Sequence, residues 1–96
     1  MSEAKLTTVV NRRYHKPTEY DVYIGRPGPW ENQFAMPADG TRDEVCDLHM
    51  AHWRKILRRN PKALRPLVGK VLVCFCKPLR CHGDNYVQLN KEHYDV

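Results

Sequence analysis

The sequence predicts a small α/β protein, a single-domain sandwich whose elements follow the order β-β-α-β-α. Three features lead to this prediction. Two short strand-like segments open the chain, an amphipathic helical segment follows them, and a buried central strand at residues 70–76 comes before a second helix. A chain of 96 residues has room for one compact domain. We therefore expect residues 1–96 to form one domain, with its core at about 6–91 and with flexible terminal residues outside the core.

The first two strands are predicted from β-branched and alternating residues. Residues 6–10 read Leu-Thr-Thr-Val-Val, a composition typical of strands. In residues 20–25, Tyr20, Val22 and Ile24 occupy alternate positions, so they would share one face of a second strand. A long loop should follow at residues 26–40, because this segment holds three prolines and two glycines. Ordered loops of this length frequently hold functional residues.

A long helix is predicted to begin after Thr41. Thr41 and Glu44 have the spacing of a capping box, and Asn60-Pro61 should end the helix after about Arg59. Helical periodicity places one mostly apolar face against the core and a basic face opposite it. The apolar face comprises Val45, Leu48, His49, His52, Trp53 and Ile56, and the basic face comprises Arg54, Lys55, Arg58 and Arg59. Residues 62–65 are expected to add one more helical turn.

The continuous apolar run that ends at residue 76 is typical of a strand buried on both sides. We expect it to be the central strand, followed by a tight loop at 77–80 and a short helix at 85–91. Ligands of open α/β sheets bind at the carboxyl ends of the strands, where helix N-termini present free amides. The sequence therefore predicts that residues 74–84 lie at the functional edge of the sheet.

Charge is distributed unevenly along the chain. The net charge is +5, from 16 Lys and Arg against 11 Asp and Glu. Residues 1–50 have a net charge of −2, whereas residues 51–96 have a net charge of +7. Such a field favours phosphate-bearing partners, a small molecule or a nucleic acid, although a solvated basic helix face without a partner produces the same pattern.

The composition is that of a soluble globular protein, with a mean hydropathy of −0.67. The chain contains no apolar run that approaches the roughly 20 residues needed to cross a bilayer. The first ten residues lack the apolar core of a signal peptide. We therefore expect a cytoplasmic protein that does not enter a membrane, and we expect its four cysteines to be reduced there.

Three interpretations of the cysteine-rich segment remain open. Cys74, Cys76, Cys81 and His82 have the ligand types and number of a zinc site, although their spacing is unusual for zinc. Alternatively, Cys81 is a reactive thiolate at a helix N-terminus, with His82 or Asp84 as the acid or base of a catalytic site. In the third interpretation, Cys74 and Cys76 are core residues and the turn at 81–82 is structural.

The loop at 26–40 offers candidate ligand-binding residues. Arg26 and Arg42 have guanidinium groups suited to phosphate or carboxylate, Asn32 can donate and accept hydrogen bonds, and Trp30 presents a stacking face. The structural alternative is a loop held in place by Trp30 and Phe34 in the core, with Arg26 in an ion pair. Both alternatives remain open at this point.

Two motifs together resemble a known family. The first is the segment 20–34, which contains Tyr-Asp-Val-Tyr-Ile-Gly-Arg-Pro and then Trp-Glu-Asn-Gln-Phe. The second is the segment 69–84, with Cys-Phe-Cys-Lys-Pro and Cys-His-Gly-Asp. In this order, with Arg42 between them, they resemble the domain-of-unknown-function 4326 family of small bacterial and phage proteins over residues 9–89. Glu31 stands where the family usually has Gly, and Gln33 where it usually has Pro.

The resemblance implies an α/β fold and a site shared by the two motifs, without an established reaction. If the chain is phage-encoded, its expected location is the host cytoplasm. We expect a site formed by the 26–34 and 74–84 loops that binds a nucleotide or another phosphate-bearing ligand, either as an enzyme or as a sensor. The alternative is a non-enzymatic protein that contacts nucleic acid or a host protein through its basic half, with the cysteine loop structural or zinc-bound.

Overall fold

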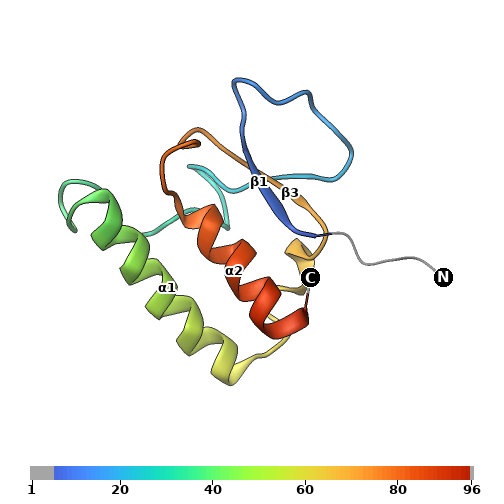
Figure 1. The fold of residues 1–96 in the computed structure, drawn as a ribbon. Helices are drawn as coiled ribbons and strands as arrows, with labels where there is room; N and C mark the ends of the chain where they lie inside the picture. The colour runs from blue at the N-terminus through green and yellow to red at the C-terminus, as the bar shows by residue number, and fades with distance from the viewer. Residues whose placement is uncertain (1–5, 96) are drawn as a thin grey trace.

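The computed structural model describes residues 6–95 and confirms the α/β class and the β-β-α-β-α order (Figure 1). A short 3-10 helix, η1, precedes the last strand. The elements are β1 (Thr8–Asn11), β2 (Asp21–Tyr23), α1 (Arg42–Arg59), η1 (Arg65–Leu67), β3 (Val71–Cys74) and α2 (His82–Tyr94). The chain ends were predicted to be flexible. Part of this prediction falls on residues 1–5 and 96, which lie outside the described residues.

The three strands form one parallel sheet in the order β1-β3-β2. The predicted central strand is therefore confirmed, but it ends at Cys74 and not at residue 76. Cys74 pairs with Asn11 at the end of β1, and β2 ends one step earlier, opposite Val73. Beyond Cys74 the chain has no neighbouring strand to pair with, so residues 75–80 form a loop.

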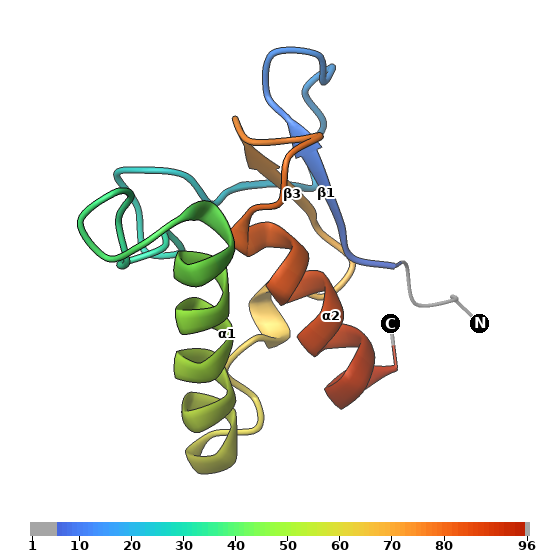
Figure 2. The same ribbon diagram turned by 60° about the vertical axis from the view of Figure 1, so that its left-hand side comes forward.

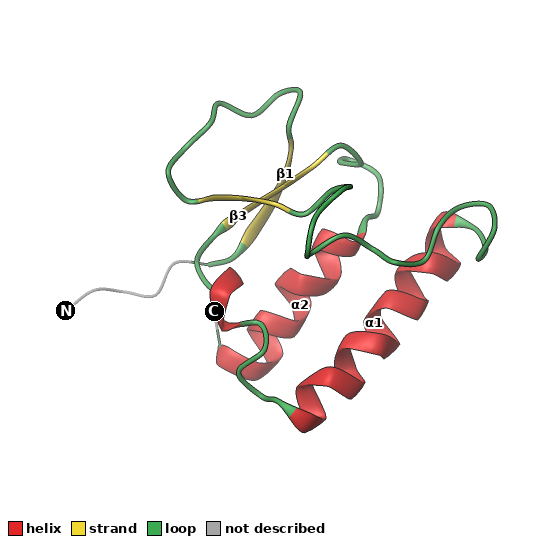
Figure 3. Cartoon of the chain, turned by 180° about the vertical axis from the view of Figure 1, so that it is seen from behind, coloured by secondary structure: helices red, strands yellow, loops and turns green. Residues whose placement is uncertain are grey.

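Both helices lie on one side of the sheet, and the connection between β1 and β2 passes on the other side (Figures 1 and 3). Leu72 faces the helices with its register partners Val9 and Val22, all of them in or against the hydrophobic core. Leu72 and Val73 are both buried, so β3 is buried on both faces as predicted. Phe75, however, is 61% exposed, because it lies in the loop beyond the sheet.

Helix α1 begins and ends as predicted. Glu44 donates its amide to the Thr41 hydroxyl over 3.3 Å, and the Glu44 carboxylate accepts from the Thr41 amide over 2.9 Å, which completes the capping box. The buried face is rotated from the predicted one. Leu48 is exposed, whereas Cys46 and Leu57 are buried, because α1 packs chiefly against α2 and not squarely on the sheet (Figure 2).

Two predictions for the second half of the chain were wrong in extent. The turn expected at 62–65 is instead the 3-10 helix Arg65–Leu67. Helix α2 is longer than the expected 85–91, since it begins directly after Cys81 and continues to Tyr94. Its last turn is held by the Tyr94 hydroxyl, which donates to the carbonyl of Pro61. Within residues 6–95, no helix has the length and apolar character needed to cross a membrane.

Candidate functional site

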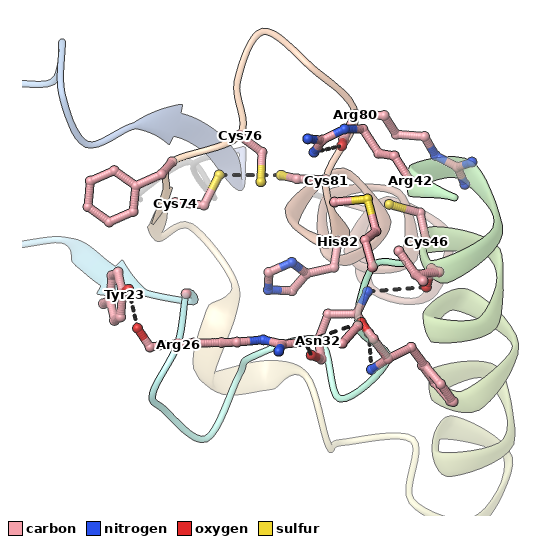
Figure 4. A pocket seen from close by; sticks show the side chains of 16 residues that line it. Tyr23, Arg26, Asn32, Arg42, Cys46, Cys74, Cys76, Arg80, Cys81 and His82 are labelled. Carbon is pink, nitrogen blue, oxygen red and sulfur yellow. Dashed lines mark hydrogen bonds between the residues drawn. The ribbon is translucent and has the colours of Figure 1, made fainter. Parts of the chain in front are cut away.

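A cavity of about 480 Å³ lies at the carboxyl edge of the sheet (Figure 4). Parallel strands end at the same edge, so the loops after β2 and β3 meet there, and both α1 and α2 begin there. The cavity wall takes residues from both motif segments and from the first turns of both helices. The polar and sulfur-containing members of the wall are Arg26, Asn32, Met36, Arg42, Cys46, Cys74, Cys76, Arg80, Cys81 and His82.

All four cysteines of the chain line this cavity. Cys74 ends β3 and Cys81 precedes α2, and their Sγ atoms lie 3.3 Å apart in a buried hydrogen bond. Cys76 is half-buried in the loop between them. Cys46 comes from α1 and was not among the predicted site residues. Its spacing from the other cysteines contains no signal of a shared site, because only the packing of α1 beside α2 brings it there.

The hydrogen bond between the two thiols shifts their pKa values in opposite directions. The pKa of Cys74 is lowered to about 6, chiefly by its hydrogen bond with the Cys81 thiol, with further backbone hydrogen bonds from Cys76 and Lys77. The same contact and burial raise the pKa of Cys81. The thiolate expected at Cys81 from its place before a helix is therefore favoured on Cys74.

The structure does not bring the candidate zinc ligands together as a metal site. Among residues 6–95, no group of three or more His, Cys, Asp or Glu side chains is arranged to hold a metal ion. His82 Nε2 lies 2.7 Å from the carbonyl oxygen of Ile24, which makes this nitrogen a donor rather than a metal ligand.

His82 and Asp84 both have structural contacts at the start of α2. His82 is buried, and burial lowers its pKa, so the ring is neutral at pH 7. Asp84 accepts from the Cys81 amide over 3.2 Å and forms an ion pair with Lys77 over 2.6 Å. His82 lines the cavity and Asp84 does not. Of the two candidate acid–base groups, only His82 is placed to meet a ligand in the cavity.

Arg26 and Asn32 organise the loop that forms one wall of the cavity (Figure 4). Arg26 Nη2 donates to the carbonyls of Asn32 and Phe34, over 2.5 and 3.2 Å. Arg26 Nε lies 3.4 Å from the carboxylate of Glu31, a residue that departs from the family pattern. The Asn32 side chain donates to the carbonyl of Val45 over 3.1 Å, which ties the loop to α1. Both side chains line the cavity while holding its wall in shape.

Trp30 packs in the core and does not line the cavity. Its ring stacks on Trp53 with centroids 5.8 Å apart, and it meets the edge of Tyr86 at the same distance. The Tyr86 hydroxyl donates to the Trp30 carbonyl over 2.9 Å. The structure therefore places Trp30 where the structural alternative expected it, as an anchor of the loop.

Arg42 and Arg80 meet at the opposite side of the cavity. Arg42 Nη1 donates to the carbonyl of Arg80 over 3.1 Å. The Arg80 guanidinium turns toward α1, where it pairs with Asp43 at 3.2 Å and Asp47 at 2.8 Å. In Figure 4 the Arg42 hydrogen bond is the dashed line beside the Arg80 label. Arg80 lies in the loop that was predicted at 77–80, but its place in the cavity wall was not predicted.

Aromatic side chains form the rest of the wall, and they were not among the predicted site residues. Tyr23 and Phe75 meet edge to face with centroids 6.4 Å apart. Phe34, in the loop after β2, also lines the cavity. Two signals in the sequence could have identified this aromatic wall. One is the alternation of side chains along β2, and the other is the position of Phe75 between two cysteines.

The two histidines on the predicted apolar face of α1 do not line the cavity. His49 is buried, and its Nδ1 accepts from the Asn85 side chain over 3.0 Å. Burial lowers the pKa of His49 to about 3. His52 meets the ring of Phe34 edge to face at 6.3 Å, behind the cavity wall.

The predicted basic face lies toward the other end of α1. Arg54 is paired with Glu92 of α2, with Nη1 2.8 Å from the carboxylate. Lys55, Arg58 and Arg59 are exposed. The structure therefore separates the basic face from the cavity along the helix axis.

Comparison with known proteins agrees with the motif resemblance. The family described as "Domain of unknown function (DUF4326)" matches residues 10–92. The chain is also 35% identical over 86 residues to an uncharacterised 12.4 kDa protein in the nrdA-td intergenic region of Enterobacteria phage T4, covering 86% of this chain and 76% of the phage protein. No solved structure matches the chain. The chain belongs to the domain-of-unknown-function 4326 family.

Proposed function

We propose that the cavity binds a small phosphate-bearing ligand of nucleotide size. The observation that supports this proposal is a cavity of about 480 Å³ at the carboxyl edge of a parallel sheet, with Arg42 and Arg80 on one side and the Tyr23–Phe75 ring pair on another. Its volume lies within the range of about 300–1,000 Å³ found for small-molecule sites. The carboxyl edge is also where ligands of open α/β sheets bind.

Arg42 is the group best placed to receive the phosphate. Among the described residues, its hydrogen bonds use only Nη1, which donates to the Arg80 carbonyl. A guanidinium has five donors, so Nη2 and Nε are left for a ligand oxyanion. The Nη1 contact fixes the orientation of the group before the ligand arrives, which reduces the entropy lost on binding.

Tyr23 and Phe75 offer a face for the apolar part of the ligand. Phe75 is 61% exposed and Tyr23 is 37% exposed, although they lie at the wall of a cavity. Large exposed aromatic rings of this kind stack on flat rings such as nucleobases. A ligand that joins a flat ring to a phosphate would satisfy both sides of the cavity.

Calorimetric titration tests this function. Nucleoside monophosphates and inorganic phosphate are titrated into the full chain, its Arg42→Ala variant and its Arg59→Ala variant. Loss of charge-assisted hydrogen bonds costs about 1.5–3 kcal/mol, so Arg42→Ala should weaken nucleotide binding by roughly 10- to 150-fold. Arg59 is exposed at the far end of α1, so Arg59→Ala should bind as the unaltered chain does.

A second variant separates the two halves of the ligand. Phe75 is exposed, so Phe75→Ala should fold normally. It should weaken nucleotide binding by about 5- to 150-fold, the loss expected for one stacking partner at about 1–3 kcal/mol, and leave the binding of inorganic phosphate unaffected. Absence of binding by every nucleotide and by phosphate would reject the proposal.

The alternative function, nucleic-acid binding through the basic half, is supported by the exposure of Lys55, Arg58 and Arg59. Phosphate-backbone contacts of this kind weaken steeply as salt rises. A mobility shift with short duplex and single-stranded probes should then disappear when Arg54, Arg58 and Arg59 are neutralised together. Unchanged shifts in that variant would reject the basic-face proposal and leave the cavity proposal intact.

A further inference from the structure

We propose that Cys74 and Cys81 are a redox-active dithiol, which a small hydroperoxide entering the cavity oxidises to a disulfide. The two Sγ atoms lie 3.3 Å apart and point at each other from the end of β3 and the start of α2 (Figure 4). Both side chains line the cavity although each is at most 2% exposed. A molecule close to water in size can therefore reach the sulfurs, while the access of larger reagents to them is restricted.

Cys74 is the attacking sulfur. Its hydrogen bond with the Cys81 thiol and the backbone hydrogen bonds from Cys76 and Lys77 stabilise a negative charge on its sulfur. The Lys77 ammonium, held by Asp84 next to the start of α2, adds a positive charge nearby. Thiolates react with peroxides and thiols do not, so the sulfur that holds the charge reacts first.

The reaction balances with hydrogen peroxide as the oxidant. The Cys74 thiolate attacks one peroxide oxygen, the O–O bond breaks, and hydroxide leaves and takes a proton to become water. Cys74 is then a sulfenic acid. The Cys81 thiol gives up its proton and attacks the Cys74 sulfur, so that the S–S bond forms and the S–O bond breaks, with release of a second water. Two thiols lose two electrons, and one peroxide becomes two waters.

The position of Cys81 makes it the resolving thiol. A disulfide bond is about 2.05 Å long, so closing the 3.3 Å contact requires the sulfurs to approach by little more than 1 Å. Such proximity converts the second step into a fast intramolecular reaction. Cys46 lies on α1, and burial raises the pKa of its thiol, so it competes poorly with Cys74 for the peroxide. This inference does not depend on the proposed ligand, because it requires only that peroxide enter the cavity.

The test is peroxide treatment of the full reduced chain, followed by differential alkylation and mass spectrometry. Free thiols are blocked, the oxidised ones are reduced and given a second label, and each cysteine is then assigned. The expected result is loss of two of the four thiols, with the second label on Cys74 and Cys81 of a monomeric chain. Reducing agent should restore all four. This measurement needs no variant and does not depend on whether a variant folds.

Matched variants assign the roles. Cys76→Ser should still lose two thiols, whereas Cys81→Ser should stop at a sulfenic acid on Cys74, which dimedone captures when it is added together with denaturant. The inference is overturned if the second label appears on Cys76 or Cys46, if Cys76→Ser abolishes disulfide formation, or if peroxide leaves all four thiols of the folded chain free. Nucleotide binding is measured in parallel. Disulfide formation does not require that a nucleotide bind, so the failure of one proposal does not imply the failure of the other.

Discussion

The two ends of α1 hold arginines in different ways. At the first turn, Arg42 donates to a loop carbonyl, and Arg80 is drawn to α1 by Asp43 and Asp47. At the last turn, about 27 Å away for an 18-residue helix, Arg58 and Arg59 are exposed to solvent. The excess of positive charge lies in the second half of the chain, but the oriented guanidinium groups lie at the cavity. The contrast teaches that the regions of highest positive charge and of oriented guanidinium groups differ, and the proposed function rests on the second.

The end of the molecule that holds the cavity depends on the hydrophobic core. A substitution in that core should therefore have the largest effect on stability. Leu72 is fully buried in β3 under the cavity. Leu72→Ala should lower the free energy of unfolding by about 2–5 kcal/mol, because it removes buried methyl groups and leaves a void. Urea denaturation measures this change. Arg59→Ala at the other end should change stability by less than about 0.5 kcal/mol, and equal losses in both variants would contradict the comparison.

Asn32 should show the next largest effect. Its buried side chain donates to the Val45 carbonyl and accepts from the Phe34 amide over 2.9 Å, which joins the loop to α1. Asn32→Ala should cost about 1–3 kcal/mol, since it removes two hydrogen bonds that contribute about 0.5–1.5 kcal/mol each. The neighbouring Gln33 is exposed, so Gln33→Ala is the matched control in thermal denaturation. If the two variants are equally stable, Asn32 does not hold the loop.

The buried His49 in the middle of α1 predicts that the stability of the protein depends on pH. Burial lowers the pKa of His49 from 6.5 to about 3. The unfolded chain binds a proton below about pH 6.5 and the folded chain does not until about pH 3, so stability falls as the pH falls through this window. From pH 6.5 to pH 5 the loss should be about 1.5 kcal/mol from this group, and the lowered pKa of His82 acts in the same direction.

Comparison of unfolding midpoints at these two pH values measures the histidine effect. His49→Gln should reduce the difference between them, because it removes one of the two buried groups. His93→Gln changes an exposed histidine of α2 and should leave the difference as it is in the unaltered chain. Identical pH dependence in all three proteins would show that folding does not lower the pKa of His49.

The smallest effect is expected at the basic end. Arg54 and Glu92 form an exposed ion pair between α1 and α2. Pairs of this kind contribute about 0.2–1 kcal/mol. Arg54→Gln should therefore lower stability by less than about 1 kcal/mol, and the difference should shrink further in high salt. A loss as large as that of Asn32→Ala would mean that the two ends of α1 are held with similar strength.

Local signals in the sequence were sufficient for much of the fold. The capping box at Thr41, the stop at Asn60-Pro61 and the apolar run of β3 predicted the elements, because each depends on neighbouring residues. The meeting of the 26–34 loop with the 74–84 segment was also expected, because parallel strands end at one edge of a sheet.

Other features depend on packing between distant elements, which local patterns do not contain. The rotation of α1 that exposes Leu48 and brings Cys46 to the cavity follows from its contact with α2. Trp30 packs on Trp53, in a different element, and so became an anchor of the core. The contact between the Cys74 and Cys81 sulfurs depends on the path of the loop that joins them, and the sequence indicated only that both lie near the same edge.

Amide chemical shifts of the isotope-labelled chain, followed during titration with a nucleoside monophosphate, test most directly whether the carboxyl-edge cavity is the functional site. We predict shifts confined to the residues around the cavity, at 23–36, 42–46 and 74–82, with the amides of 54–62 unmoved. Shifts concentrated at 54–62, or none at saturating nucleotide, would contradict the account.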